Sequence, residues 1–441
     1  MPATLPLNPS SIESPVTSRV RRHFPGASNG EFGLPPELVP VLRRGQGCRV
    51  WDVDGREYLD LTMAWGAALV GHAHPRVVEA ATRQAALGAN FAAVNERSLE
   101  LAERLCALSP CAERVRFVAS GTEATMLCLR VARTATNRPK ILRFEGAYHG
   151  QHPEGVAGML RGRAGELPAV DAAGAGAAWV ARDVLVAPFN DLAATEAIVE
   201  RHAGEIAGII VEPLHRCLAP KDGFLAGLRD LTRKHGIVLV FDEVVTGFRL
   251  AYGGAQEYYG VAPDLVAYGK ALGGGFPIGA FAGRADLMEA VNEHRVNEPG
   301  YVWSASTAGG NPVSCAAALA TLDVLGEQGV YPGLHRAGEA LRERMRAVLA
   351  DEPAPAQVLG DGPLAQLAFS ARPVIDLQGW LAADRQKSRA LMLELVRRGV
   401  FLNPMGTKLY LSLAHDEAAL DAFAEHLSAA LATLRERGPE V

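Results

Sequence analysis

The stretch Asp264-Leu-Val-Ala-Tyr-Gly-Lys270-Ala-Leu-Gly-Gly-Gly-Phe-Pro-Ile-Gly279 is the part of the sequence that best indicates the fold. Its apolar start predicts a short buried strand, and its glycines predict a tight turn directly after Lys270. In open α/β sheets, ligands bind at the carboxyl ends of the strands, which is where Lys270 stands. A desolvated lysine loses its proton and forms a Schiff base with a carbonyl, whereas an arginine stays charged. We therefore predict that Lys270 is a reactive amine rather than a strand-end lysine that reaches for solvent.

The composition is that of a soluble enzyme. Hydrophobic residues make up 49% of the 441 residues and charged residues 21%, and this length fits about two or three domains. The net charge of −5 gives no reason to expect a nucleic acid as a partner. The apolar runs 206–211 and 237–241 are too short to span a bilayer, and no basic segment followed by an apolar one stands at the N-terminus. We therefore expect a cytoplasmic protein that does not bind a membrane.

No metal site is expected from the sequence. The cysteines include no Cys-x-x-Cys pair, so their spacing fits neither a disulfide framework nor a zinc site, and we expect reduced, mostly buried thiols. His72 and His74 flank Ala73 without a neighbouring carboxylate or cysteine, which is not the spacing of a known ligand set. The six cysteines are Cys48, Cys106, Cys111, Cys128, Cys217 and Cys315.

The sequence divides into four segments. Residues 1–20 are rich in Pro, Ser and Thr and predict a flexible N-terminal arm. Residues 21–74 form an N-terminal segment with a β-hairpin. Residues 75–325 alternate apolar strands with helical periods, which predicts a large α/β domain with a mostly parallel sheet between helices. Residues 326–441 predict a smaller α+β domain.

Local patterns predict the elements of these segments. Alternating apolar residues on both sides of Asp54-Gly55 predict a hairpin with a primed turn. In the C-terminal segment we expect helices over about 333–351 and 386–398 and from Asp416 onward, with a strand pair near 400 and 410. The large domain has seven strand-like runs, Val115–Val118, Ile141–Phe144, Val184–Ala187, Gly208–Val211, Val238–Phe241, Leu265–Ala267 and Ala280–Ala282.

Two further strand ends carry candidate functional residues. Ser120-Gly-Thr-Glu123 predicts a capping box at a helix N-terminus, where free N–H groups also suit a phosphate. Asp242 directly follows a strand, and a buried carboxylate needs a cationic or hydrogen-bonding partner such as a protonated pyridine nitrogen. About 28 residues separate Asp242 from Lys270, enough for one helix and a return strand, so both are expected at one edge of the sheet. A helix cap alone is the simpler explanation of either motif.

Two loops are less specific. The loop Glu145-Gly-Ala-Tyr-His-Gly150 presents Tyr148, whose ring can stack on a planar heterocycle but is as often an ordinary surface residue. The segment Ser304-Ala-Ser-Thr307, before Gly309-Gly-Asn-Pro312, has hydroxyls that can bind an oxyanion. Neither loop identifies a function by itself.

Together these motifs resemble the class III pyridoxal-phosphate-dependent aminotransferases of fold type I, and within them the glutamate-1-semialdehyde 2,1-aminomutase branch. The resemblance covers nearly the whole chain, and the blocks around Asp242 and Lys270 are its most specific parts. It implies an α/β large domain with a mostly parallel seven-stranded sheet, and a smaller α+β domain built from N- and C-terminal segments. The matching motifs are Pro25-Gly26, Trp65-Gly66, Gly71–Pro75, Ser120–Thr125, Glu145–Gly150, Val211–Pro213, Asp242–Arg249, Gly269-Lys270, Gly273–Gly275 and Ser412–His415.

The resemblance also implies pyridoxal 5'-phosphate (PLP) as the cofactor and gives residues their roles. Lys270 is implied to hold the cofactor as a Schiff base and then to move a proton, and Asp242 to keep the pyridine nitrogen protonated. Gly121 and Thr122 are implied to bind the phosphate from one subunit of a homodimer, and Thr307 from the other. The other implied cofactor contacts are Ser120, Tyr148 stacked on the ring, His149, Glu212, and Val244 against the opposite ring face.

Two positions differ from the aminomutase branch. Cys217 stands where that branch has an asparagine, and Met405-Gly-Thr-Lys408 replaces an acidic segment. We take Trp65, Cys217 and Lys408 as candidate substrate residues. The changes favour a ping-pong aminotransferase that takes a small amino donor and an aldehyde or ketone acceptor, for example in amino-sugar or aminoglycoside metabolism.

Other activities fit the same scaffold. The main alternative is the aminomutase itself, or another PLP isomerase or epimerase. A PLP-binding protein without turnover is disfavoured, because the chain retains both Lys270 and Asp242.

Overall fold

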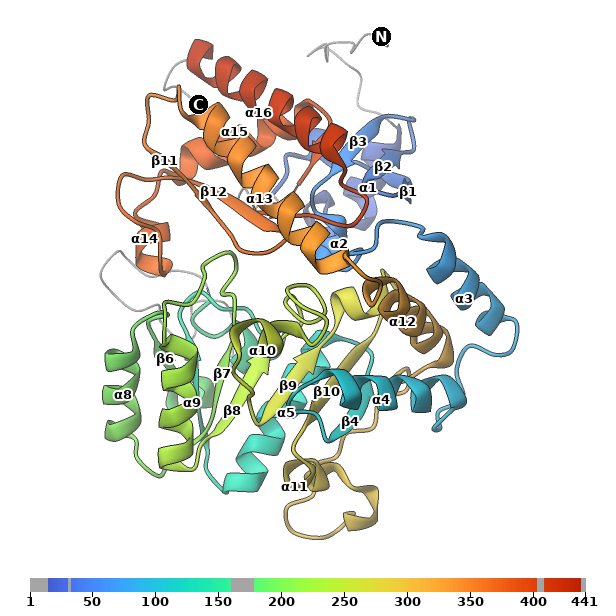
Figure 1. Ribbon diagram of the computed structural model, residues 1–441, viewed down its shortest axis with the longest axis vertical. Coiled ribbons are helices and arrows are strands. Elements are labelled where there is room, and N and C mark those ends of the chain that lie inside the picture. The colour runs from blue at the N-terminus through green and yellow to red at the C-terminus, as the bar shows by residue number, and fades with distance from the viewer. Residues whose placement is uncertain (1–14, 31–32, 160–177, 403–407, 438–441) are drawn as a thin grey trace.

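The computed structural model describes residues 15–30, 33–159, 178–402 and 408–437. In Figure 1 a large domain around a twisted sheet fills the lower half of the view, and a smaller domain above it holds the first and last helices that are described. None of the helices in these ranges is long and apolar enough to cross a membrane.

A seven-stranded sheet forms the centre of the large domain. Its strands are β4 Arg114–Val118, β5 Lys140–Phe144, β6 Val184–Ala187, β7 Ile206–Val211, β8 Val238–Asp242, β9 Leu265–Tyr268 and β10 Gly279–Gly283. They lie in the order β4-β10-β9-β8-β7-β5-β6, and β10 runs antiparallel to the other six strands. Each run expected from the sequence is one of these strands, so the predicted sheet is confirmed.

Both faces of this sheet are buried by helices. These are α4 Glu96–Leu108, α5 Gly121–Thr136, α8 Leu192–Arg201, α9 Phe224–His235, α10 Gly254–Tyr259 and α12 Pro312–Leu325, and α3 Pro75–Ala85 packs on α12. Successive residues of a strand point to opposite faces, and on β8 Phe241 belongs to one apolar cluster while Val240 belongs to another. Strands β7 and β9 are therefore apolar throughout, as expected of strands covered on both sides.

The small domain joins the two ends of the chain. Its elements are β1 Leu42–Gln46, β2 Arg49–Asp52, β3 Glu57–Asp60, α13 Val330–Leu349, β11 Ala356–Leu359, β12 Leu364–Phe369, α15 Arg385–Arg397, β13 Val400–Phe401, β14 Leu409–Tyr410 and α16 Glu417–Arg437. Strand β13 pairs in parallel with β3, Val400 opposite Leu59, and completes a sheet β1-β2-β3-β13. A second sheet has the order β11-β12-β14. The expectation of a small domain made from N- and C-terminal segments is confirmed.

Short helices complete the described chain. They are α1 Pro15–His23, α2 Met63–Gly66, α6 Pro153–Val156, α7 Ala178–Asp183, α11 Ala285–Met288 and α14 Leu377–Leu381. Residues 15–20 of the expected arm are thus helical, and residues 1–14 lie outside the described ranges.

Two other local expectations differ from the structure. The strands near 400 and 410 do not pair with each other, because β13 joins β3 and β14 joins β12. The hairpin turn is not of the primed type, since Gly55 has a φ of 86° and Asp54 is not among the residues with positive φ. The Asp52 carboxylate instead accepts the N–H groups of Asp54 and Arg56 and so closes a longer loop.

Candidate active site

The expected site residues gather at the carboxyl edge of the large sheet. Asp242 is the last residue of β8, and Lys270 follows β9, its direct neighbour in the sheet. Glu212 follows β7, and Tyr148 and His149 lie in the loop after β5. The expectation that Asp242 and Lys270 share one edge is confirmed.

Lys270 has a backbone conformation that is rare for a lysine. It opens the 3-10 turn η3 Lys270–Gly273 with a φ of 42°, in the left-handed region that disfavours a side chain. Strain of this kind clusters at functional sites, where the surrounding fold enforces it. Burial lowers the pKa of the Lys270 amine, and the Lys408 ammonium lowers it further, against the opposing effects of Tyr410 and Asp242. The unprotonated, nucleophilic amine is therefore more populated than in a free lysine.

The Asp242 carboxylate is buried and held by two donors. Its Oδ1 accepts the Val244 N–H at 3.1 Å, and its Oδ2 lies 2.7 Å from Nδ1 of His149. Burial lowers the pKa of His149, although the hydrogen bond to Asp242 opposes this effect, so the ring is neutral and donates its Nδ1–H to the carboxylate. His149 Nε2 has no hydrogen-bond partner among the described residues.

The N-terminus of α5 opens toward this edge. The Ser120 side chain caps the helix by accepting the Glu123 N–H at 3.2 Å. Glu123 does not accept the Ser120 N–H of the expected capping box; its Oε2 accepts the Ala119 N–H at 2.9 Å and the Ser120 hydroxyl at 3.1 Å. Gly121 has no room for a side chain, since a Cβ there would lie 2.7 Å from Cγ1 of Val244. The helix therefore presents bare N–H groups where its dipole favours an anion.

The loop after β5 packs on the same helix end. A Cβ on Gly150 would lie 2.8 Å from the Thr122 Cα, and the Gln151 N–H points to the Thr122 Oγ1 at 3.4 Å. Tyr148 is half-buried, and its N–H donates to Oε1 of Glu212 at 2.9 Å. Gly121, Thr122 and Tyr148 thus lie close together at the sheet edge.

The Glu212 carboxylate holds two loops together, the loop after β5 and the loop after β7. Besides the Tyr148 N–H, its carboxylate accepts the Arg216 N–H at 3.2 Å. Burial alone would raise the pKa of Glu212, but the nearby positive charge of Arg216 outweighs this effect and keeps the pKa low. Arg216, with a φ of 61°, also donates to the Gly146 carbonyl at 3.1 Å. Sequence reasoning missed Arg216, although it directly precedes Cys217.

The candidate substrate residues lie where the small domain meets Lys270. Lys408 is buried, with its Nζ 5.1 Å from the ring centroid of Tyr410. Trp65 belongs to α2, a strained turn that contacts η3, and the Tyr410 ring packs on the adjacent Gly66. Cys217 is 1% exposed and its Sγ lies 3.7 Å from the Ala365 carbonyl oxygen, so its thiol contacts β12 of the small domain.

Thr307 lies in a loop that is held near the start of α5. It is exposed, and its carbonyl accepts the Asn90 Nδ2–H at 2.9 Å. The neighbouring Ser306 donates its hydroxyl to Glu123 at 2.9 Å, which ties the loop to the start of α5.

Arg249 is a residue whose role the sequence did not indicate. It is fully buried and donates to the carbonyls of Val245, at 2.9 Å, and Gly66. Its guanidinium lies 5.6 Å from the Tyr410 ring centroid. Arg249 therefore fixes the strained turn that carries Trp65, a long-range contact with no local signal.

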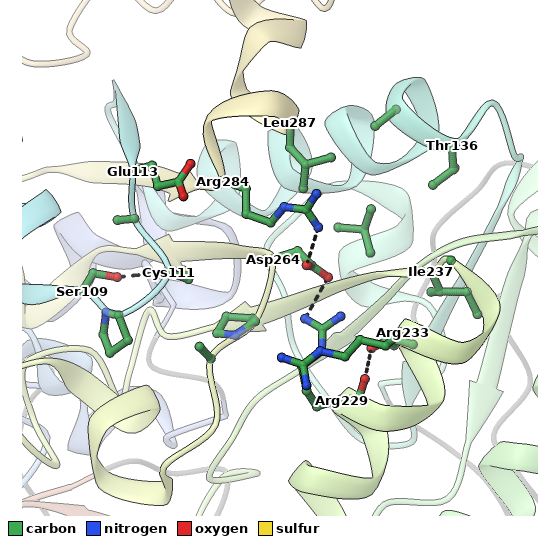
Figure 2. A pocket seen from close by; sticks show the side chains of 18 of the residues that line it. Ser109, Cys111, Glu113, Thr136, Arg229, Arg233, Ile237, Asp264, Arg284 and Leu287 are labelled. Atoms are coloured by element: carbon green, nitrogen blue, oxygen red, sulfur yellow. Dashed lines mark hydrogen bonds and ion pairs between the residues drawn. The ribbon is translucent and has the colours of Figure 1, made fainter.

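A separate hollow lies at the opposite edge of the sheet. Figure 2 shows this hollow, of about 650 Å³, where Asp264 precedes β9 and pairs with Arg229 at 2.9 Å and Arg284 at 3.1 Å. None of the expected site residues lines it, and Asp264 pairs with both Arg229 and Arg284. We therefore assign these groups a structural role.

The described ranges contain neither a metal-binding cluster nor a disulfide. No group of three His, Cys, Asp or Glu side chains in them is arranged to hold a metal ion. All six cysteines are free, and five of them are buried, as the sequence predicts.

Comparison with known proteins identifies the class of this protein. The family model described as aminotransferase class-III matches residues 35–431. The chain therefore belongs to the class III aminotransferases and is a PLP-dependent enzyme of fold type I, as the motifs predict. The site fits this cofactor, because it offers a primary amine, a buried carboxylate on an adjacent strand and a side-chain-free helix N-terminus.

Relatives of known structure or name resemble nearly the whole chain. A Desulforudis audaxviator protein named glutamate-1-semialdehyde 2,1-aminomutase is 42% identical over 383 residues, 86% of this chain and 87% of the relative. The structure of an ω-transaminase from Sphaerobacter thermophilus is 35% identical with a TM-score of 0.89, covering 96% of this chain and 98% of that one. A glutamate-1-semialdehyde aminomutase structure from Pseudomonas aeruginosa is 26% identical with a TM-score of 0.82, covering 94% and 93%.

Proposed function

We propose that this enzyme uses Lys270 and Asp242 to move an amino group from a small amino donor to an aldehyde or ketone acceptor. The observation that carries the proposal is the primary amine and the buried carboxylate at adjacent strand ends, with His149 bound to the carboxylate at 2.7 Å. PLP, when bound, supplies an electron sink for charge that develops at the substrate carbon.

The chain's own groups have distinct tasks in this proposal. Lys270 Nζ is the nucleophile toward a carbonyl and, when free, the base that moves a proton at the substrate carbon. Asp242 keeps a neighbouring pyridine nitrogen protonated, because an adjacent negative charge favours the charged form of a base. Tyr148 and Val244 cover the two faces of the ring. Val244 packs against Gly121, and this contact supports its proposed position on one face of the pyridine ring.

The phosphate site extends to a second subunit in this proposal. Ser120, Gly121 and Thr122 provide the N-terminus of α5, and Thr307 reaches the phosphate from the other copy of a homodimer. The exposure of Thr307 supports this arrangement. Exposed apolar side chains in the segments that hydrogen bond with the Thr307 loop support it too, because a subunit interface would cover them. These side chains and their exposed fractions are Leu87 73%, Phe91 52%, Val94 86%, Leu99 52% and Trp303 62%.

Subunit sharing has a direct test. Mixing Lys270→Ala with Thr307→Ala subunits gives heterodimers in which one site carries both changes and the other carries neither. We expect activity to recover on mixing. Absence of recovery despite confirmed subunit exchange contradicts a shared site.

A second candidate activity is the intramolecular aminomutase reaction. The names of the curated relatives favour this activity over a general aminotransferase. The sequence change from an acidic segment to Met405-Gly-Thr-Lys408 favours transfer between molecules, because a cation weakens the grip on a free amino intermediate. Residues 405–407 lie outside the described ranges, and the buried Lys408 carries this argument.

A nitrogen-labelling experiment separates the two activities. The purified enzyme is incubated with an isotopically labelled amino donor and a carbonyl acceptor, and the products are analysed by mass spectrometry. Transamination places the label in a different molecule. Efficient conversion of glutamate-1-semialdehyde to 5-aminolevulinate, without donor or acceptor, identifies the aminomutase and contradicts our preferred activity.

A further inference from the structure

The turn that carries Trp65 has an unfavourable backbone. Met63, Ala64 and Trp65 have φ values of 45°, 52° and 58°, so three consecutive residues with a side chain lie in the left-handed region. The Cβ atom makes this conformation unfavourable, and proteins use it for single residues, most often glycine. Such strain persists only where the surrounding structure enforces it, and it clusters at functional sites. Contacts from outside the turn therefore hold it in this shape.

Asp60 holds the start of the turn. Its Oδ1 accepts the N–H groups of Thr62 at 2.7 Å and Met63 at 2.9 Å. Its Oδ2 accepts the Nε2–H of His72 at 2.7 Å, and the Asp60 side chain is 2% exposed. A buried carboxylate needs such donors, and its hydrogen bonds are stronger than those between neutral groups. The carboxylate and the N–H groups of the turn therefore fix one another.

Both ends of the turn are anchored to other parts of the fold. His72 exchanges backbone hydrogen bonds with Gly47, at 2.8 and 2.9 Å, which fixes the residue that donates to Asp60. At the other end, the buried Arg249 donates to the carbonyl of Gly66. The left-handed segment is thus held by a carboxylate at its start and by a guanidinium at its end.

We propose that Asp60 is a positioning residue for amino-group transfer and that it acts by holding Trp65. The turn contacts η3, which begins with Lys270, so a change in the turn moves Trp65 relative to the reactive amine. Both carboxylate oxygens of Asp60 are occupied by protein donors, so this residue acts through the turn and not on the substrate. The proposal rests on the amino-group transfer proposed for Lys270.

A double-variant cycle tests whether Asp60 acts through Trp65. Asp60→Ala leaves two N–H groups of the turn without their acceptor, and we expect it to lower kcat/KM about 10- to 100-fold. Asp60→Asn keeps an acceptor oxygen and should lose less activity. In a Trp65→Ala background, Asp60→Ala should lower kcat/KM less than about threefold, because the side chain that the turn positions is absent.

An equal loss in both backgrounds overturns the proposal, because a general loss of stability acts whether or not Trp65 is present. A loss in Asp60→Asn as large as that in Asp60→Ala contradicts it as well. If Asp60→Ala does not fold, His72→Leu takes its place in the cycle, because it removes the donor that orients the carboxylate.

Two alanine-to-glycine changes test the strain without an activity assay. Ala64 is exposed and has a left-handed φ of 52°, whereas Ala67, at the end of the same turn, has a right-handed φ of −73°. Both changes add similar freedom to the unfolded chain, so their difference reports the left-handed backbone. In the Asp60→Ala variant, we expect Ala64→Gly to give a higher Tm than Ala67→Gly. We also expect it to restore part of the near-UV circular dichroism of Trp65, measured as the difference from Trp65→Phe.

The role of Asp60 and the proposed function fail separately. Equal Tm values for the two glycine variants, or no restored Trp65 signal with Ala64→Gly, contradict the role of Asp60. Wild-type kcat/KM in Asp60→Ala does the same while amino-group transfer stands. If the wild-type holoenzyme converts no amino donor, the proposed transfer is wrong, and the glycine comparison still decides whether Asp60 holds the turn.

Discussion

His149 donates its Nδ1–H to the Oδ2 of Asp242 across 2.7 Å, and both side chains are buried at the end of the central strands. This contact fixes the carboxylate at the sheet edge, next to the strand that delivers Lys270. The neutral ring orients the carboxylate without cancelling its negative charge, because burial lowers the pKa of His149.

The contact predicts a measurable role for His149. Replacing it with alanine removes a hydrogen bond to a charged group, worth about 1.5–3 kcal/mol, and we expect kcat/KM to fall about 10- to 100-fold. The exposed His294→Ala variant should keep wild-type activity. An unchanged kcat/KM and cofactor affinity in His149→Ala would mean that the contact has only a packing role.

Asp242→Asn tests the charge of the carboxylate. The change keeps the shape of the side chain and its hydrogen bond from Val244, but the neutral amide no longer favours a protonated pyridine nitrogen. We expect the rate of amino transfer to fall by several orders of magnitude while the thermal stability stays close to that of wild type. Near-normal turnover would show that Asp242 is a structural cap.

Gly121 and Val244 allow a compensation experiment. Gly121→Ala places a Cβ about 2.7 Å from a methyl carbon of Val244, so we expect the helix N-terminus to shift and cofactor affinity to fall. Val244→Ala removes that clash, and the double variant should regain affinity relative to Gly121→Ala. Equilibrium dialysis of the cofactor measures both effects. Additive losses without recovery contradict the steric explanation.

The strand ends of the large sheet were predictable from the sequence. Asp242 and Lys270 each follow an apolar run, and the parallel α/β pattern brings such positions to one edge. Likewise, the Ser120 cap is visible as a local motif, whereas the choice of Glu123 to accept the Ala119 N–H rather than the Ser120 N–H depends on geometry that the motif does not specify.

The contacts between distant segments were not predictable. Pairing of β13 with β3 joins residues more than 300 positions apart, and two-residue strands carry almost no periodic signal. The same holds for Arg249, which reaches Gly66 and Tyr410 through tertiary packing alone.

His415 predicts a pH dependence of stability. Its Nδ1 accepts the Ser412 N–H at 3.0 Å and its Nε2–H donates to the Asp60 carbonyl at 3.1 Å, so the neutral ring is satisfied at both nitrogens. Burial lowers the pKa of His415 from 6.5 to about 4. Between these values the unfolded chain binds a proton that the folded chain does not, so the free energy of unfolding falls as pH drops from 6.5 to about 4.

Chemical denaturation at a series of pH values measures this effect. One histidine contributes a slope of up to about 1.4 kcal/mol per pH unit, and we expect His415→Gln to reduce the total slope by a large part of that amount. His294→Gln serves as the control, because His294 is exposed. An unchanged slope in His415→Gln contradicts the prediction.

The most direct test of the central claim is to locate the lysine that binds the cofactor. The PLP-loaded enzyme is reduced with borohydride, digested and mapped by mass spectrometry, with Lys270→Ala as the control. We predict that the reduced adduct lies on Lys270 and is absent from the variant. An adduct on Lys140, Lys221, Lys234, Lys387 or Lys408 of the wild-type enzyme contradicts the account.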